Sequence, residues 1–341
     1  MTKRELIEKT LAGVPTGRVA VSPLVCGAAR GLVGASYKEW STDASLCGES
    51  FVRAAELLDM DCVTLLVDLS IECAAWGQGV IFPENEAARP DYSKKIIKTP
   101  GNYAKIKRVD WKSSDRMRFY ADLCGYVVKK IGVSVPVFAF VFGPLGTLSM
   151  CRGQEDLFMD MYDCPEKVKA ASHEIALTLA EYAGALCDTG VDGVMLDTLF
   201  ASGSIMSKEM WEDAEGGDAL LIARAIREKG KKVLVHNCGK RVYFDSQIKY
   251  MNPDAISFLY PPDDCDGFDE CREKYGGSVT LIGCVPPTYA VMGSDEEWSE
   301  ICRSQIKSLS GGRFILSTGC EYPAGADLNR ARLMVDAARR A

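Results

Sequence analysis

The chain has 341 residues, enough for one large core or two modest domains. Its hydrophobic content of 47% and charged content of 26% are typical of a soluble globular protein. The net charge is −7 and no cluster of Lys and Arg stands out, which argues against a nucleic-acid-binding surface because phosphate binding needs such a cluster.

The N-terminal sequence MTKRELIEKTLAG is charged and amphipathic and lacks the apolar core of a signal peptide. No apolar run approaches the roughly 18 residues that a membrane span needs. The 14 cysteines are scattered, many of them in apolar runs such as LLDMDCVTLL, so we expect them to be mostly reduced and buried. We therefore expect a cytoplasmic protein from a reducing, anaerobic setting, without nucleic-acid or membrane partners.

Short apolar runs without strict alternation recur along the chain. Runs of this kind, rich in Val, Ile, Leu and Phe, are typical of strands buried on both faces of a parallel sheet. A weaker candidate for an eighth strand is GVIFP (79–83). The seven clear runs are CVTLLVD (62–68), VPVFAFVFG (135–143), VDGVMLD (191–197), KVLVHNCG (232–239), DAISFLY (254–260), VTLIGCV (279–285) and RFILSTGC (313–320).

Amphipathic runs with helix start and stop signals lie between most of these strands. Their alternation with strands predicts a (β/α)8 TIM barrel over residues 61–341, in one domain with an N-terminal helical and loop appendage of residues 1–60. A doubly wound sheet is the alternative, but no strand is followed by a GxGxxG turn. The clearest helical runs span residues 113–132, 165–190, 207–230 and 294–312.

The polar segment 84–112 breaks this alternation and contains two prolines. We interpret it as a long excursion after an early strand, of the kind that covers the substrate in barrel enzymes.

In such a barrel the active site forms where the C-terminal ends of the strands converge. His236 and Cys238 leave one predicted strand, and Cys320 leaves another. Two thiolates and one imidazole favour zinc, and three protein ligands leave a fourth position open, as in catalytic zinc sites. Local spacing alone does not establish the site, because a chain with 14 cysteines places one near a histidine by chance fairly often.

Other polar residues follow the same strand ends. Asp197 and Glu72 are candidate catalytic residues, and Asp68, Asn237 and Tyr260 are candidates for positioning the substrate.

Three further features have ordinary structural interpretations. His173 reads as a helix residue, Cys284 as a core thiol, and the acidic run MWEDAEGGD as a solvated face.

Several motifs resemble the uroporphyrinogen decarboxylase superfamily, and within it the corrinoid-dependent methyltransferases. LVHNCG (234–239) and LSTGCEYPAGADLNRARLMVDAAR (316–339) are the most specific, because they are similar to the segments that carry the zinc ligands in methylcobalamin:coenzyme M methyltransferases. The resemblance also covers DLSIECAAWGQGVIFPENEAARP (68–90), FGPLGTLSMCRGQEDLF (142–158), GVDGVMLDTLFASGSIMSKEMWED (190–213) and GCVPPTYAVMGSDEEWSE (283–300).

The resemblance implies a zinc methyltransferase that works with a separate corrinoid protein, whose cobalamin cobalt carries the methyl group. The second substrate would be a thiol such as coenzyme M, tetrahydrofolate, or an O- or N-methyl donor such as a methoxyarene. A metal-independent decarboxylase is the first alternative, but PLVCGAARGLVGASYKEW contains only Arg30 where the decarboxylases have an arginine-rich segment. A non-catalytic subunit that docks the corrinoid protein is the second.

Overall fold

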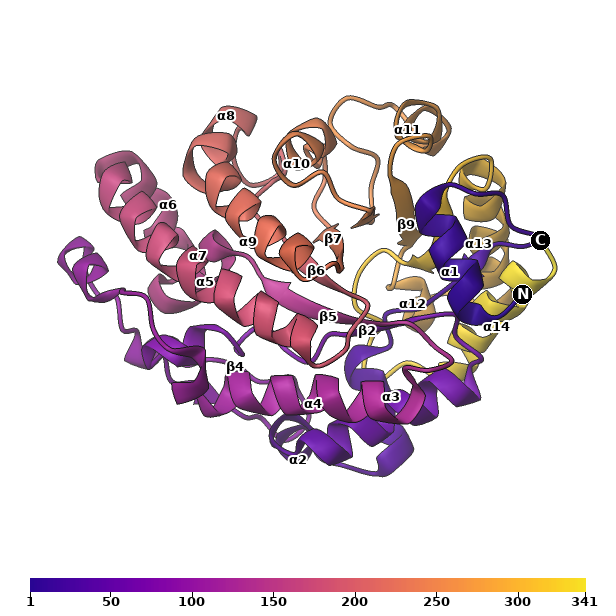
Figure 1. The fold of residues 1–341 in the computed structure, drawn as a ribbon, viewed down its shortest axis with the longest axis horizontal. Helices are drawn as coiled ribbons and strands as arrows, with labels where there is room; N and C mark the ends of the chain where they lie inside the picture. Colours follow the sequence, from indigo (N-terminus) through magenta and orange to yellow (C-terminus); the bar gives the residue numbers. More distant parts are fainter.

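Eight parallel strands form one curved sheet at the centre of the computed structural model, which describes residues 1–341 (Figure 1). The strand order is β1-β10-β9-β8-β7-β6-β5-β2. The strands are β1 (Ala20–Val21), β2 (Val63–Leu65), β5 (Val137–Phe142), β6 (Gly193–Asp197), β7 (Lys232–Asn237), β8 (Ala255–Phe258), β9 (Thr280–Val285) and β10 (Phe314–Thr318).

Helices surround this sheet, and both chain termini lie at one end of the molecule (Figure 1). None of the helices combines the length and apolarity needed to cross a membrane. The α-helices are α1 (Lys3–Ala12), α2 (Tyr37–Thr42), α3 (Ala44–Leu57), α4 (Asp115–Ile131), α5 (Pro144–Arg152), α6 (Gln154–Asp163), α7 (Pro165–Asp188), α8 (Lys208–Trp211), α9 (Gly217–Glu228), α10 (Phe244–Met251), α11 (Phe268–Tyr275), α12 (Tyr289–Met292), α13 (Asp295–Leu309) and α14 (Leu328–Arg339).

The seven clear strands and the four long helical runs predicted from the sequence are confirmed, and so is the barrel class. The eighth barrel strand is β1, however, and the prediction that 79–83 supplies it was wrong. That segment contains β3 (Val80–Ile81), which pairs only with β4 (Arg89–Pro90) in a separate antiparallel sheet. Segment 1–60 therefore contributes a barrel strand as well as surrounding helices.

The polar segment 84–112 contains no α-helix, as expected for an excursion. Its regular parts are β4 and the short 3₁₀ turns η3 (Tyr92–Lys94), η4 (Pro100–Lys105) and η5 (Trp111–Ser113). Hydrogen bonds from Tyr103 to Asp160 and from the Arg108 amide to Glu174 attach it to α6 and α7.

The core has two parts, one between the sheet and the helices and one inside the barrel. Helix α1 closes the N-terminal end of the barrel, because its apolar residues Leu6, Ile7 and Leu11 belong to the inner cluster. A capping box between Thr2 and Glu5 starts this helix, and Gly13 ends it in the left-handed conformation. All 14 cysteines are free and all but four are buried, which confirms the expectation of reduced, buried thiols.

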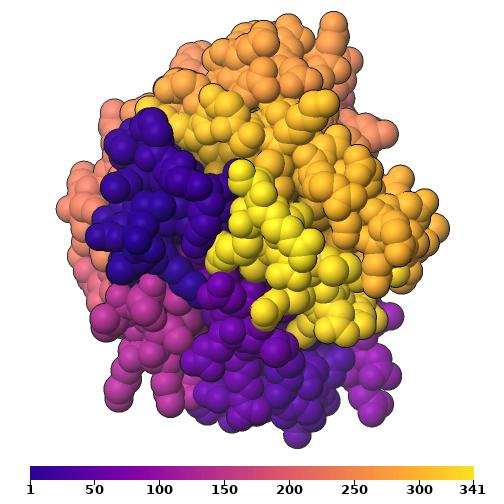
Figure 2. Space-filling model, turned by 90° about the vertical axis from the view of Figure 1, so that its right-hand side faces the viewer, coloured from indigo at the N-terminus to yellow at the C-terminus, as the bar shows by residue number.

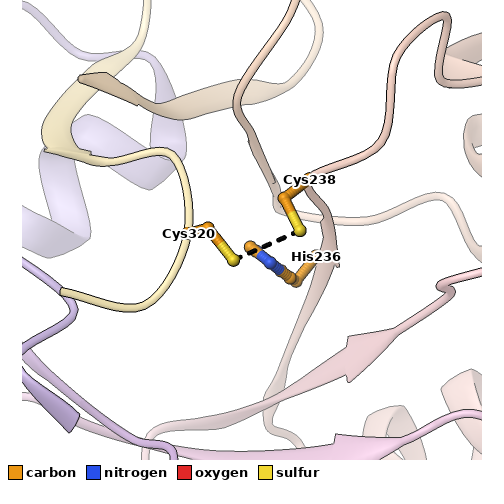
Figure 3. A group of neighbouring side chains, drawn as sticks. All are labelled: His236, Cys238 and Cys320. Carbon is orange, nitrogen blue, oxygen red and sulfur yellow. Dashed lines mark hydrogen bonds between the residues drawn. The ribbon is translucent and has the colours of Figure 1, made fainter. Parts of the chain in front are cut away.

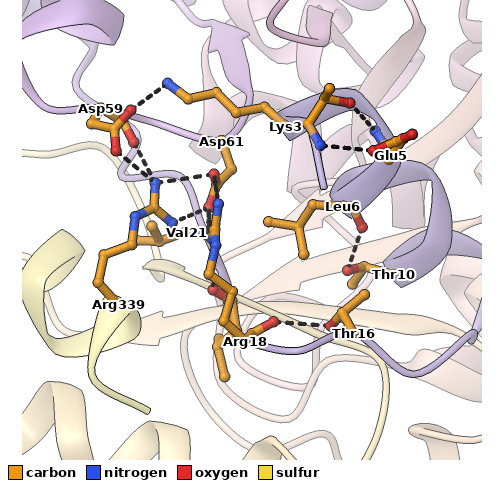
Figure 4. A network of polar contacts seen from close by, with 12 residues as sticks. Lys3, Glu5, Leu6, Thr10, Thr16, Arg18, Val21, Asp59, Asp61 and Arg339 are labelled. Atoms are coloured by element: carbon orange, nitrogen blue, oxygen red, sulfur yellow. Dashed lines mark hydrogen bonds and ion pairs between the residues drawn. The ribbon is translucent and has the colours of Figure 1, made fainter.

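The barrel closes between its two shortest strands, β1 and β2. The Asp61 amide donates to the Val21 carbonyl, and the Asp61 carboxylate accepts from the Val21 amide, each at 2.9 Å. That carboxylate is fully buried and pairs with Arg18 at 2.7 Å and with Arg339 at 2.8 Å (Figure 4). Burial raises the pKa of Asp61, but hydrogen bonds from Arg18 and Arg339 outweigh it and hold the pKa below its ordinary value.

We predict that Asp61→Asn destabilises the fold by about 3 kcal/mol, because it leaves two guanidinium groups without their buried carboxylate. Asp59→Asn is the matched control, since Asp59 also pairs with Arg339 but its side chain is 55% exposed, and it should cost less than about 1 kcal/mol. Urea unfolding measures both values. Equal losses would contradict a special role for Asp61.

The pairing of Asp61 with Arg18 and Arg339 also predicts that the stability of the fold depends on pH. A carboxylate with a lowered folded-state pKa stabilises the fold above its unfolded pKa, and this contribution disappears as the pH falls through the folded value. We therefore expect part of the wild-type stability to be lost below the ordinary aspartate pKa of 3.8, and the loss to be smaller in Asp61→Asn.

Candidate metal centre

His236, Cys238 and Cys320 converge at the barrel mouth, the face formed by the C-terminal ends of the strands. Their candidate ligand atoms all lie within 4.8 Å of one another (Figure 3). His236 lies in β7, Cys238 directly follows this strand, and Cys320 lies two residues beyond the end of β10. The three residues that were expected to meet at the strand ends therefore do lie together, and their role as metal ligands stays a prediction.

Neighbouring strands hold His236 in place. In the parallel register it stands beside Asp197 of β6 and Ser257 of β8. Its Nδ1 lies 2.9 Å from the Ser257 hydroxyl, and its ring packs 5.9 Å from the ring of Phe140. Because Nδ1 is occupied by this hydrogen bond, Nε2 is the nitrogen left free to bind a ligand.

The two sulfur atoms, of Cys238 and Cys320, lie 3.2 Å apart. This distance is far longer than the roughly 2.05 Å of a disulfide, so both are thiols. The neighbouring Cys238 and His236 side chains hold the pKa of Cys320 well below its ordinary value. A thiol that loses its proton easily is suited to metal binding, because the thiolate is the form that coordinates.

Of the two candidate catalytic residues, Asp197 is the one whose carboxyl group keeps an oxygen atom free of hydrogen bonds. Its side chain is buried, and its Oδ1 atom has no hydrogen-bond partner. Burial raises the pKa of Asp197 to about 7, while His236 opposes the rise and Cys320 adds to it. These influences show that the carboxyl group lies within electrostatic reach of the three candidate ligands.

The carboxyl groups of Glu72 and Asp68 already have partners within the protein. Glu72 accepts a hydrogen bond from the Phe142 amide at 3.0 Å, and burial raises its pKa to about 7. Asp68 forms a buried ion pair with Arg116 and accepts from the amide and hydroxyl groups of Ser70. Both carboxyl groups lie beyond the end of β2, on the side of the mouth nearest β5.

Asn237 is also engaged, whereas Tyr260 is accessible. The Asn237 amide group donates to the Thr198 carbonyl at 2.6 Å and accepts from the Gly239 amide at 2.8 Å. It therefore shapes the loop that carries Cys238. Tyr260 is 38% exposed just after β8, and the Lys240 ammonium lies 5.4 Å from its ring centre.

Two carboxyl groups, the partly buried one of Glu321 and the fully buried one of Glu215, were not among the predicted site residues. Glu321 directly follows Cys320, and burial raises its pKa to about 7, with Cys320 adding to the rise. Glu215 lies in the π-helical segment η6 (Glu212–Gly216), within the acidic run that reads as a solvated face, yet it is fully buried. The burial of Glu215 could not be predicted from the sequence, because the residues of this acidic run differ in their exposure.

Glu215 holds the loop between β5 and α5. Its Oε1 atom accepts from the Leu145 amide at 2.8 Å, and its Oε2 atom accepts from the Trp211 indole at 2.7 Å. Helix α5 has no side-chain cap of its own, so Glu215 supplies a hydrogen-bond acceptor at its N-terminus. The adjacent Gly143 amide donates to the Asp197 carbonyl, which connects this loop to the site.

The ordinary interpretations of His173 and Cys284 agree with the structure. His173 lies in α7 with 58% of its side chain exposed and contacts Asp218, and Cys284 is buried in β9.

Known proteins match this chain over nearly its whole length. The family model for uroporphyrinogen decarboxylase (URO-D) matches residues 2–341. A protein named methylcobamide:CoM methyltransferase MtbA, from Methanosarcina acetivorans, is 20% identical over 344 residues, covering 99% of this chain and 98% of its own. The protein of the same name from Methanosarcina mazei is 20% identical over 346 residues, with the same coverage.

Solved structures share the fold. A methyltransferase from Methanosarcina mazei superimposes with a TM-score of 0.85 at 17% identity, covering 100% of this chain and 99% of its own. A B12-independent methionine synthase from Shewanella sp. W3-18-1, in complex with selenomethionine, gives a TM-score of 0.55 at 16% identity, covering 87% of this chain and 86% of its own. These likenesses support the barrel architecture.

We predict that Glu215→Gln destabilises the protein by about 1–3 kcal/mol, because the new amide group must point a donor at either the Leu145 amide or the Trp211 indole. Glu212→Gln, which changes the exposed partner of Lys249, should cost less than about 1 kcal/mol. Chemical denaturation measures both. If Glu215→Gln is as stable as the wild type, the capping role of Glu215 is wrong.

Proposed function

Because the chain belongs to the uroporphyrinogen decarboxylase family and carries His236, Cys238 and Cys320 together at its barrel mouth, we propose that it is a zinc-dependent methyltransferase of a corrinoid system. It moves a methyl group between a corrinoid protein and a small substrate. The convergence of these three side chains is the observation that carries the proposal. The relatives named for methyl transfer between methylcobamide and CoM support the same reaction class.

The donor set fits zinc. One imidazole and two sulfur atoms are ligands that zinc prefers, and three protein ligands are the number found in catalytic sites. The Ser257 hydroxyl orients the His236 ring by holding Nδ1, which is the usual arrangement around a zinc-binding histidine. When bound, the metal supplies a positive charge that keeps a thiol substrate deprotonated or polarises the leaving atom of a methyl donor.

The protein's own residues prepare the rest of the reaction. Asp197 offers an unpartnered carboxyl oxygen that can hold a proton or orient the small substrate beside the metal position. The buried His236 and Phe140 rings limit water on the inner side of the site. A corrinoid protein docked at the barrel mouth would supply the cobalt that exchanges the methyl group, and the residues of the mouth would hold the small substrate in position for this exchange.

The mouth is poorly suited to a polycarboxylate porphyrinogen. The buried carboxyl groups of Asp197 and Glu72 and the partly buried one of Glu321 lie there, and the nearby Arg116 is already paired with Asp68. These groups offer no free positive charge to the carboxylates of such a substrate, so this arrangement argues against its decarboxylation. A non-catalytic docking subunit would not need three ligand groups held together.

We predict that freshly purified protein contains one zinc per chain and that chelation abolishes methyl transfer from methylcobalamin to a thiol, with recovery on adding zinc. Cys238→Ala and Cys320→Ala should each lose both zinc and activity while the circular dichroism spectrum is unchanged. Cys164→Ala, at another partly exposed cysteine, is the control and should retain both. Protein that transfers methyl groups at the full rate without zinc would overturn the proposal.

A panel of thiols, tetrahydrofolate and methoxyarenes in the same assay identifies the small substrate and the direction of transfer. Activity on a porphyrinogen after zinc removal would instead favour the decarboxylase. Tight binding of a corrinoid protein without turnover of any substrate would favour the docking subunit.

We predict that Asp197→Asn lowers kcat by about 100-fold, because an amide cannot exchange a proton at this position. Zinc content should be unchanged, since Asp197 is not one of the three ligands. Asp218→Asn, at another largely buried aspartate that contacts His173 instead, should retain nearly full activity. An Asp197→Asn variant with wild-type kcat would show that this carboxyl group has no part in the reaction.

A further inference from the structure

The end of the barrel opposite the candidate metal centre contains a cavity of about 540 Å³. Its walls come from the segments that precede β1, β9 and β10, so it lies at the N-terminal ends of these strands. Figure 2 views this end, where the indigo N-terminal segment meets the gold and yellow C-terminal segments. The volume is in the range of small-molecule binding sites.

A second hollow of about 310 Å³ lies between α13 and α14 and shares Ile306 and Ala341 with the first. The two hollows are therefore neighbours, and we call them together the basal groove. It is separate from the barrel mouth, because none of its lining residues belongs to the metal centre or to the loops around it.

The basal groove is strongly basic, although the whole chain carries a net charge of −7. Asp336 is the single acidic side chain among the lining residues of both hollows, and it already lies 3.7 Å from Arg332. The lining cations are Arg18, Arg303, Lys307, Arg313 and Arg340.

Three of these cations have no carboxylate partner. Arg18 is paired with Asp61, and Arg303 with Glu300. No ion pair involves Lys307, Arg313 or Arg340. The Arg313 side chain makes two hydrogen bonds within the protein, which its Nη1 atom donates to the carbonyls of Leu11 and Ser278. The Nε and Nη2 atoms of Arg313 make no hydrogen bond within the protein, and they lie against Gly13.

Glycines let a ligand approach the backbone beside Arg313. Gly276, Gly277, Gly311 and Gly312 all line the larger hollow. The Gly276 and Gly312 amides already donate to the carbonyls of Arg272 and Leu309. The Gly277 and Gly311 amides make no hydrogen bond within the protein, and without side chains they can approach phosphate oxygens, as the amides of glycine-rich phosphate-binding loops do. Gly13 leaves room for Arg313 itself, because a Cβ atom there would lie 2.3 Å from the arginine Nε atom.

We propose that the basal groove binds a small molecule that carries a polyphosphate chain. The phosphates lie against Arg313 and the glycine-rich wall of the larger hollow, and Lys307 and Arg340 extend the positive surface along the smaller one. Three cations without carboxylate partners favour several linked phosphates over a single one, because each phosphate adds charge-assisted hydrogen bonds. This site is independent of the methyl-transfer chemistry.

Isothermal titration calorimetry of the full chain with ATP and with inorganic tripolyphosphate tests the proposal. We expect saturable binding of one molecule per chain. The variant Lys307→Ala/Arg313→Ala/Arg340→Ala should bind at least about tenfold more weakly, because each cation lost removes charge-assisted contacts. Tighter binding of ATP than of tripolyphosphate identifies a nucleotide as the ligand type, and equal binding identifies the phosphate chain alone.

The matched control is Lys38→Ala/Lys105→Ala/Lys129→Ala, which removes three exposed cations elsewhere and gives the same net charge. It should bind like the wild type. No binding of either probe, or equal weakening in both triple variants, would overturn the proposal. Lys307→Ala/Arg340→Ala changes only exposed residues and keeps the test valid if the Arg313 substitution impairs folding. Because no methyl transfer is measured, the result does not depend on the proposed enzyme activity.

Discussion

The barrel depends on one buried carboxylate at its seam. Strand β1 has only two residues, too few for a ladder of backbone hydrogen bonds that would hold it against β2. Asp61 compensates by bonding to both backbone groups of Val21 and to two arginines from distant parts of the chain. Removing a carboxylate from water is costly, and only such complete pairing offsets the cost.

This seam also determines the geometry of the metal centre. Strand β1 lies beside β10, and the chain after β1 holds the loop that carries Cys320. The Leu24 amide donates to the Thr318 hydroxyl, and the Tyr322 amide donates to the Leu24 carbonyl, one bond on each side of Cys320. His236 and Cys238 come from β7, three strands further round the sheet. The curvature of the sheet from β10 to β7 brings the two halves of the site together, and the segment after β1 holds the half that carries Cys320.

The elements that could be predicted from the sequence are those whose burial requires a recognisable run of apolar residues. Barrel strands are covered on both faces, so β5 and β9 appear as unbroken apolar runs, and His236, Cys238 and Cys320 could be placed at strand ends. Strand β1 has no such pattern, because Asp61 and two arginines hold it instead of a long apolar run. Segment 79–83 has strand-like composition, but composition does not specify a pairing partner. Glu215 was missed because a single buried acid inside an acidic run of mixed exposure has no periodicity of its own.

The two ends of the barrel differ in charge, and this difference constrains what each can bind. Carboxyl groups of Asp197 and Glu321 surround the mouth, where a neutral or weakly charged methyl carrier meets the least repulsion. The unpaired cations of the basal groove lie at the opposite end, separated from the mouth by the apolar interior of the barrel. An anion that binds there occupies the opposite end of the barrel and leaves the mouth open. Under the two proposals, the protein would hold a polyphosphate at one end and keep the mouth at the other end free for a small methyl donor or acceptor.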